Sequence, residues 1–216
     1  MGLHKIIIAA GLSIIGSAAF AQTATMPPHT TVFTGNTRGY WFTAPTDFIM
    51  TGIQVLLPPG SGNPLMNFAV VRFDGAVPPP AFPTTTNAFT QLALGLDVPQ
   101  AAFAPINVLV NTGDVIGVYG NTITGQGVSP GTNSYGNGGL GTTIFGNNVI
   151  LNRSGMQFHL GSVTSPQGMH DLWTEGTGGG NITRVEFTYS AVPEPATIAA
   201  FAIGGLGLLL RRRLKK

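Results

Sequence analysis

Hydrophobic and polar residues alternate with a period of two through much of the chain between residues 22 and 192. Val185, Phe187 and Tyr189, for example, are separated by single polar residues. This spacing places one row of side chains in a core and the other row toward water, as in a half-buried β-strand. Further rows of this kind are Met156, Phe158 and Leu160; Ile106, Val108 and Val110; and Ile49, Ile53, Val55 and Leu57. No run in this region has the 3.6-residue period of a long helix, so an all-β fold is predicted.

The order of strands and turns indicates the architecture of this region. Asn67–Phe73 is hydrophobic on both faces apart from one arginine, which is typical of a central strand. Thr112–Asp114 is interpreted as the turn of a hairpin between strands at 106–111 and 115–119, with Gly113 supplying a positive φ. About ten such strands are expected to close into a two-sheet β-sandwich of the jelly-roll type.

Several segments between the strands are predicted to be turns or loops. Shorter turns are indicated at Asn137–Gly138 and Thr177–Gly180. Two longer polar or Pro/Gly-rich stretches, Gly75–Asn87 and Gly125–Gly141, are predicted to be loops, and long loops are where binding residues most often lie. Since no charged or Ser-rich linker divides residues 22–192, they are predicted to form one domain.

The first 21 residues have the pattern of a secretory signal peptide. Lys5 gives a basic start, the apolar run Ile6–Ile15 follows, and Ala19 and Ala21 are the small residues of a cleavage site. As a helix, this apolar run would span only about half of the hydrocarbon core of a membrane. Cleavage after Ala21 is therefore predicted, and an uncleaved anchor is the alternative.

The charges of the chain are segregated between its ends and its middle. Residues 22–192 contain four arginines, no lysine and seven acidic residues, which gives this part a net charge of −3. Such a negative charge disfavours nucleic-acid binding, which depends on clustered Lys and Arg. The chain has no cysteine. A domain of this size can bury a sufficient core without disulfides, so their absence fits an exported protein as well.

Three elements follow one another at the C-terminal end. The prolines of Pro193–Pro195 lack backbone donors and hold this segment extended. The apolar segment Ala196–Leu210 would form a helix of about 22 Å, shorter than the roughly 30 Å core of a membrane but still able to insert. Arg211, Arg212 and Arg213 come next, and basic residues prefer the cytoplasmic side, so the body of the protein would lie outside.

This order of elements closely resembles the PEP-CTERM sorting signal of Gram-negative bacteria. The resemblance is confined to residues 192–216. It implies that Pro193, Glu194 and Pro195 form a motif recognised by exosortase, a membrane-embedded cysteine protease, and that Arg211–Arg213 is the stop element. The protease would remove the tail during export to the cell surface or the exopolysaccharide matrix. The alternative is a plain tail anchor that is never processed.

Residues 193–216 are therefore predicted to be a sorting signal with a short transmembrane helix. The precursor would be inserted transiently in the inner membrane, where its basic cluster adheres to anionic lipid. Cleavage would remove that cluster and release the acidic body.

Few residues of the body suggest catalysis or metal binding. Its histidines are His29, His159 and His170. They lack the spacing of zinc ligands. His170, Asp171 and Glu175 lie close to Trp173 in the sequence, but a solvated surface turn is favoured over a site. The acids could form the carboxylate pair of a glycoside hydrolase only if the fold brought two of them together. No enzymatic activity, metal or cofactor is predicted.

Trp41 and Trp173 are the candidates for contact with a glycan, because sugar rings stack on exposed aromatic rings. Trp41 lies between Tyr40 and Phe42 on a predicted strand, so it faces outward if they face the core. Core packing is the favoured interpretation of this aromatic stretch.

The sequence thus predicts an exported, non-enzymatic protein with a structural or adhesive role at the cell surface or in the extracellular matrix. Its expected partners are an exosortase-type protease and an exopolysaccharide. Two other classes stay open. A carbohydrate-binding module would need solvent-facing aromatic residues, and a secreted glycoside hydrolase would need two acids that converge in a cleft.

Overall fold

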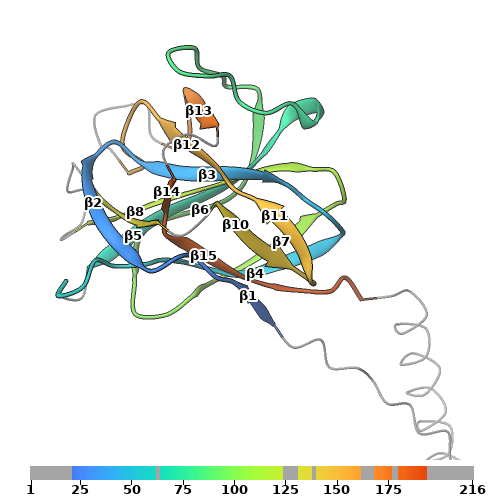
Figure 1. The fold of residues 1–216 in the computed structure, drawn as a ribbon, viewed down its shortest axis with the longest axis horizontal. Helices are drawn as coiled ribbons and strands as arrows, with labels where there is room; N and C mark the ends of the chain where they lie inside the picture. The colour runs from blue at the N-terminus through green and yellow to red at the C-terminus, as the bar shows by residue number, and fades with distance from the viewer. Residues whose placement is uncertain are drawn as a thin grey trace, which may run out of the picture. The chain divides into compact units, whose positions relative to one another are not determined.

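The described part of the chain is an all-β fold in a computed structural model (Figure 1). Fifteen strands and one short 3-10 turn make up the regular structure of these residues, which confirms the predicted all-β class. Ala21–Val192 is one compact unit. The structure describes residues 21–61, 64–123, 131–137, 140–161, 168–176 and 180–193.

The strands are short, and most of them are separated by tight turns. They are β1 (Gln22–Ala24), β2 (His29–Gly35), β3 (Arg38–Thr43), β4 (Phe48–Val55), β5 (Leu65–Phe73), β6 (Phe89–Pro99), β7 (Ala104–Val110), β8 (Val115–Ile123), β9 (Gly131–Asn137), β10 (Gly141–Ile144), β11 (Asn147–Ile150), β12 (Asn152–Met156), β13 (Leu172–Gly176), β14 (Asn181–Thr183) and β15 (Val185–Ser190). The 3-10 turn η1 (Asp74–Ala76) follows β5.

The strands form two large antiparallel sheets and one separate hairpin. The four-stranded sheet has the order β1-β15-β4-β7. The larger sheet has the order β13-β12-β3-β8-β5-β6, with β9 joined to β8 and flanked by β2 and β14. The hairpin consists of β10 and β11. Across both sheets, β1 pairs with β15, β3 with β8, β4 with β7, and β5 with β6. The early strands of the chain therefore pair with later ones in a nested order.

The main hydrophobic core lies between the two large sheets. Phe187 of β15 stacks on Phe42 of the larger sheet and on Phe48 of its own sheet, with ring centroids 5.8 and 6.2 Å apart. The buried Tyr40 hydroxyl donates a hydrogen bond of 2.6 Å to the carbonyl oxygen of Val185. Val185, Phe187 and Tyr189 are all buried, as their alternation predicts. These contacts join the two sheets face to face.

A second, smaller core covers the opposite face of the larger sheet. Its buried members are Ala69, Val71, Phe73, Val115, Tyr119, Met156, Leu160, Met169 and Leu172. Strand β5 therefore contributes to both cores, and it pairs with β6 on one side and β8 on the other. The central position predicted for Asn67–Phe73 is confirmed.

The hairpin predicted around Thr112–Asp114 is wrong. Gly113 does have a positive φ of 85°, and the Asp114 carboxylate accepts a hydrogen bond from the backbone N–H of Asn111. The turn, however, connects β7 in the four-stranded sheet to β8 in the larger sheet. A tight turn has the same local sequence whether its two strands pair with each other or cross between sheets, so the sequence alone does not distinguish the two cases.

A β-bulge changes the inward row that was predicted for β4. The register shifts between Met50 and Gly52 against β7, and the pairing with β15 shifts at the same place. Phe48 and Met50 face the core before the bulge, and Ile53 and Val55 face it afterwards. Ile49 is therefore not in the buried row, because an extra residue reverses the alternation.

Two further predicted boundaries are wrong. Strand β12 ends at Met156, and Phe158 is 44% exposed, although Met156 and Leu160 are buried. The row predicted across these three residues is therefore broken. The stretch Gly125–Gly141, predicted to be a loop, contains β9, whose residues are mostly buried. Its glycine and asparagine residues pair with β2 and β14 on both sides, so tertiary pairing overrides weak strand propensity.

Gly39 of β3 lies where the backbone of β8 approaches closely. A Cβ atom at this position would collide with the carbonyl oxygen of Val118 and the Cα of Tyr119, and backbone atoms cannot move aside easily. We expect Gly39→Ala to lower the free energy of unfolding by about 1–3 kcal/mol, measured by urea denaturation. Gly141→Ala is the control, because its nearest new neighbour would be 3.7 Å away. Equal losses in the two variants would contradict the prediction.

Candidate functional site

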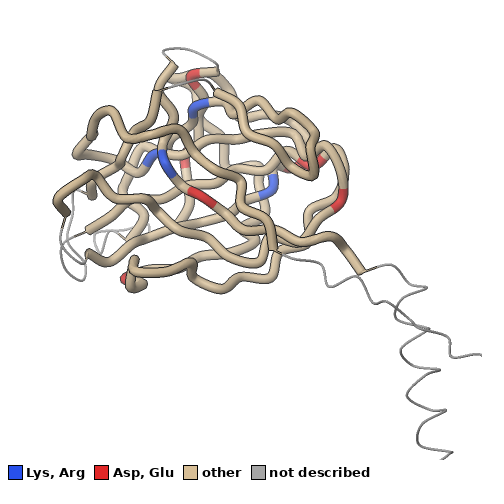
Figure 2. Tube along the Cα trace, turned by 60° about the horizontal axis from the view of Figure 1, so that its bottom comes forward, with Lys and Arg blue, Asp and Glu red and all other residues tan. Residues whose placement is uncertain are grey.

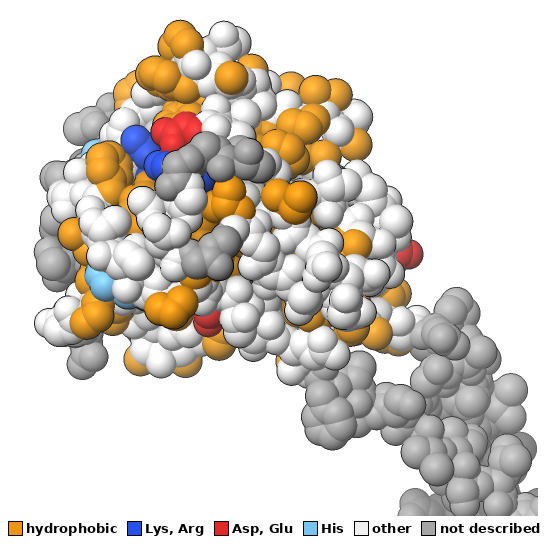
Figure 3. All heavy atoms as spheres, viewed as in Figure 1, with side chains coloured by type: hydrophobic (Ala, Val, Ile, Leu, Met, Phe, Trp, Pro, Cys, Tyr) orange, Lys and Arg blue, Asp and Glu red, His pale blue; other side chains and the backbone are white. Residues whose placement is uncertain are grey.

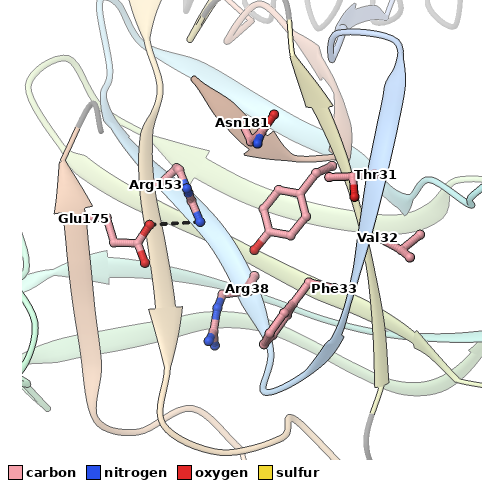
Figure 4. Close-up of a pocket in the computed structure, with 8 residues that line it drawn as sticks. Thr31, Val32, Phe33, Arg38, Arg153, Glu175 and Asn181 are labelled. Carbon is pink, nitrogen blue, oxygen red and sulfur yellow. Dashed lines mark ion pairs between the residues drawn. The ribbon is translucent and has the colours of Figure 1, made fainter. Parts of the chain in front are cut away.

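A pocket of about 260 Å³ lies where several strands of the larger sheet come together (Figure 4). We call it the arginine pocket. Its lining residues are Thr31, Val32, Phe33, Arg38, Tyr135, Arg153, Glu175 and Asn181. Strand β8 pairs with β3 as far as Gly120 and with β9 at Thr122. Strands β3 and β9 therefore lie one after the other along the same side of β8. The pocket therefore combines residues of β3, β12 and β13 with residues of β2, β9 and β14.

Arg38 is held rigidly at the start of β3. Its Nη1 donates hydrogen bonds to the carbonyl oxygens of Asn36, Thr37 and Met156, at 3.2–3.4 Å. Its guanidinium lies 4.6 Å from the ring centroid of Phe33 and 5.0 Å from that of Trp173, within the range of cation–π attraction. Figure 4 shows Arg38 and Phe33 side by side. The backbone contacts fix the direction of this side chain.

Arg153 and Glu175 form the other charged part of the pocket. Nη2 of Arg153 lies 2.9 Å from a carboxylate oxygen of Glu175, and the two side chains are 22% and 39% exposed. Figure 4 shows them pointing toward each other from β12 and β13. The guanidinium of Arg153 also lies 5.4 Å from the ring centroid of Tyr135. An ion pair this exposed adds little to stability, so it leaves Arg153 available to other anions.

Burial and neighbouring charges set the electrostatics of the pocket. Burial lowers the pKa of Arg38, and the nearby Tyr135 and Glu175 partly offset this effect. Burial also lowers the pKa of His159, and the positive charge of Arg38 acts in the same direction. The cationic groups that line the pocket are therefore Arg38 and Arg153.

The two tryptophans predicted to contact a glycan lie in different environments. Trp41 is partly buried, and its indole N–H donates a 2.8 Å hydrogen bond to the Thr174 hydroxyl. Trp173 is only 4% exposed, with Phe82 packed against its ring at 5.3 Å. A covered ring cannot take a sugar on its face, so Trp173 is corrected to a packing residue. Tyr40 and Phe42 are buried in the main core, whereas Trp41 is partly buried and packs against the second core, so it does not face freely outward.

The polar cluster considered around Trp173 is divided in two. The carboxylate of Asp171 lies 3.1 Å from Nδ1 of His170 and accepts a hydrogen bond from the side chain of Asn87. These contacts, that of His170 first, lower the pKa of Asp171. Glu175 is instead paired with Arg153. The cluster is therefore not a single site.

The acids of the body are mostly used in local contacts. Asp47 accepts hydrogen bonds of 2.7 Å from the backbone and the hydroxyl of Thr112, which lower its pKa. Asp114 pairs with Arg72 at 3.3 Å. Over the ranges that the structure describes, no group of three or more potential metal ligands lies close together.

A second cavity, of about 430 Å³, lies against the loop Gly75–Asn87. It is lined by Asp74, Val77, Pro78, Pro80, Thr85, Thr86 and Ala88. The loop is tied to β13, because Thr86 and Leu172 exchange two backbone hydrogen bonds and the N–H of Thr174 donates to Pro80. The lining is chiefly proline, threonine and small apolar side chains, with one carboxylate, so it offers little specific chemistry.

The arginine pocket was not predicted from the sequence. Its residues come from six strands between positions 31 and 181. The signal that could have found it is the scarcity of cations, since two of the four body arginines line one pocket. Figure 2 shows how sparse the charged residues are in the described part of the chain.

The predicted sorting and cleavage residues lie at the edges of the described region or beyond it. Ala21 and Pro193 are exposed and lie outside the strands. Ala19, Glu194, Pro195 and Arg211–Arg213 lie outside the described residues, as does the predicted membrane helix at 196–210. Within the part of the chain that is described, no helix is long and apolar enough to cross a membrane. The roles of these residues stay predictions.

Comparison with known proteins identifies one segment of the chain. A family model, the PEP-CTERM protein-sorting motif, matches residues 191–213. No curated protein and no solved structure matches the chain. The match begins directly after β15, which ends at Ser190. This motif implies export and processing of exosortase type, with a membrane-anchored precursor. The chain therefore carries a PEP-CTERM protein-sorting motif, which follows its all-β body.

Proposed function

We propose that the protein is a non-enzymatic component of the cell surface or the exopolysaccharide matrix, with a structural or adhesive role, delivered by exosortase. The observation that carries this proposal is the match to the PEP-CTERM motif at residues 191–213. The body before it has a net charge of −3, so cleavage would leave an acidic protein without the basic cluster that holds it to anionic lipid.

The position of the motif relative to the sheet supports processing of a folded body. Strand β15 pairs with β1 and β4 and ends at Ser190, and Ala191, Val192 and Pro193 are exposed. A cut within or after the motif would therefore remove no strand residue of the body. The protein could fold before it meets the protease.

We further propose that the body is a two-sheet β-sandwich of the jelly-roll type. The support is the nested pairing of β1 with β15, β3 with β8, β4 with β7 and β5 with β6, arranged in the orders β1-β15-β4-β7 and β3-β8-β5-β6. A jelly roll has eight strands in two four-stranded sheets, in which the first strand pairs with the last, the second with the seventh, the third with the sixth and the fourth with the fifth. The eight strands named above pair in this way. Strands β2 and β9–β14 would then be additions to it.

The arginine pocket favours glycan binding as a second candidate function. Its lining combines arginines, hydroxyl and amide groups and apolar side chains. A glycoside hydrolase is supported less, because Glu175 is the one carboxylate among the described lining residues and it is paired with Arg153. We therefore retain binding without catalysis.

The intact mass of the released protein tests the proposed delivery. We expect the material recovered from the cell surface or the medium to begin at Gln22 and to lack the Arg-rich end, so its mass would be well below the 22.4 kDa of the full chain. The membrane fraction serves as the control, because it should contain the precursor. Recovery of only full-length protein, seated in the membrane, would contradict the proposal.

A further inference from the structure

The arginine pocket is the place on the body where cations gather. Its lining contains two arginines and one glutamate, whereas the rest of the body contains two arginines and six acids. Figure 3 shows basic and acidic side chains meeting on a face that is otherwise mostly uncharged. An anion is therefore repelled by most of the body and attracted toward this pocket.

The two guanidinium groups of the pocket still have donors to offer. Arg38 uses Nη1 for three backbone carbonyls, and Arg153 uses Nη2 for Glu175. Among the described residues, no carboxylate pairs with Arg38. A guanidinium presents its donors in a planar fork that fits a carboxylate, and this hydrogen bond is stronger than one between neutral groups.

The rest of the lining fits a ring that carries hydroxyl groups. The side chains of Thr31 and Asn181 form no hydrogen bond with other described residues, so they are available to a ligand. Beside them, Val32 and Phe33 are 49% and 36% exposed and form an apolar wall. Sugars present both hydroxyl groups and apolar C–H faces, and each finds a counterpart here.

The size of the pocket limits the ligand to about one sugar unit at a time. Its volume of about 260 Å³ is just below the roughly 300 Å³ at which sites for drug-sized molecules begin. Figure 4 shows Arg153 and Glu175 on one side, and Thr31 and Val32 on the opposite side. A single charged unit of a longer chain can occupy such a site.

We propose that the arginine pocket binds a carboxylate-bearing sugar unit of an acidic polysaccharide. Arg38 and Arg153 hold the carboxylate, Thr31 and Asn181 bind hydroxyl groups, and Phe33 contacts the ring. Glu175 competes with the ligand for Arg153. The proposal rests on the proposed export, because it places the protein where polysaccharide is found.

Calorimetry on the full chain, purified in a neutral detergent, tests this proposal. The probes are an oligosaccharide of glucuronate, the matching glucose oligosaccharide, free glucuronate and sulfate. We expect the glucuronate oligosaccharide to bind at least about tenfold more tightly than the neutral one, with an affinity that falls as salt is added. Equal affinity for the neutral oligosaccharide or for sulfate would overturn the proposal. Equal affinity for free glucuronate would overturn the polysaccharide as the ligand.

Three variants distinguish binding in the arginine pocket from a general effect of charge on affinity. Arg153→Gln should weaken binding by about 10- to 100-fold, since it removes a charge-assisted hydrogen bond. Glu175→Gln should strengthen binding by about threefold or more, because Arg153 loses its competing partner. Arg72→Gln removes the same charge from the pair with Asp114, and it should leave binding unchanged.

The outcomes separate this proposal from the proposed delivery. Weaker binding in Glu175→Gln, or equal losses in Arg72→Gln and Arg153→Gln, would overturn the ligand assignment. Far-UV circular dichroism of each variant checks that it is folded. If Arg153→Gln does not fold, Glu175→Gln still tests the proposal. Binding by purified protein does not depend on tail cleavage, so an uncleaved tail with intact binding would count only against the delivery.

Discussion

Replacing Pro193, Glu194 and Pro195 together by alanine is expected to keep the protein in the membrane fraction and to reduce its release by about tenfold or more. The two prolines hold the segment extended, as a protease cleft requires, and Glu194 is the one acid in residues 193–216. The variant would lack both the shape and the charge of the motif. Cell fractionation with intact mass measurement would show unprocessed chain in the membrane.

The matched control for this experiment is Thr197→Ala. It lies in the same tail, within the matched segment 191–213 but outside the Pro-Glu-Pro motif, and it should leave release and mass unchanged. If the triple variant were released in normal amounts with the normal mass shift, the motif would not be the recognised element. The assignment of exosortase as a partner would then be wrong.

Phe187→Ala is expected to destabilise the protein by about 3–5 kcal/mol. Phe187 is fully buried between the sheets and stacks on Phe42 and Phe48. Its removal would leave a cavity in the main core, and the loss of packing adds to the lost burial of the ring. Urea denaturation should show a lower midpoint with a similar slope.

Phe158→Ala is the control for this substitution. The same ring is lost, but Phe158 is 44% exposed and follows the end of β12, so the loss should stay below about 1 kcal/mol. Losses of similar size in both variants would mean that the contact between the sheets contributes little to stability.

The sequence predicts the fold where a single local pattern determines it. Val185, Phe187 and Tyr189 are buried because β15 is regular beside the core. The same reasoning fails at Met50 and Gly52, where the bulge reverses the inward row. It fails again at Gly113, because the choice between a hairpin and a crossover depends on partners far away in the sequence.

The arginine pocket could not be predicted for a related reason. Arg38, Arg153 and Glu175 lie more than twenty residues apart in the sequence. They meet only because β12 pairs with both β3 and β13. The sequence does reveal that the body has few cations, but strand order decides which of them meet. By contrast, the sorting motif is contiguous, so its residues are visible without any knowledge of the fold.

The pairing of β1 with β15 also determines how the body responds to force. Gln22 lies opposite Tyr189, and Ala24 lies opposite Phe187. Strands β1 and β15 therefore run antiparallel, and the start of β1 lies beside the end of β15. Tension applied between these ends would open the hydrogen bonds of the pair one after another, as in unzipping, rather than shear them together. A body tethered at both ends would thus be expected to yield first where β1 pairs with β15.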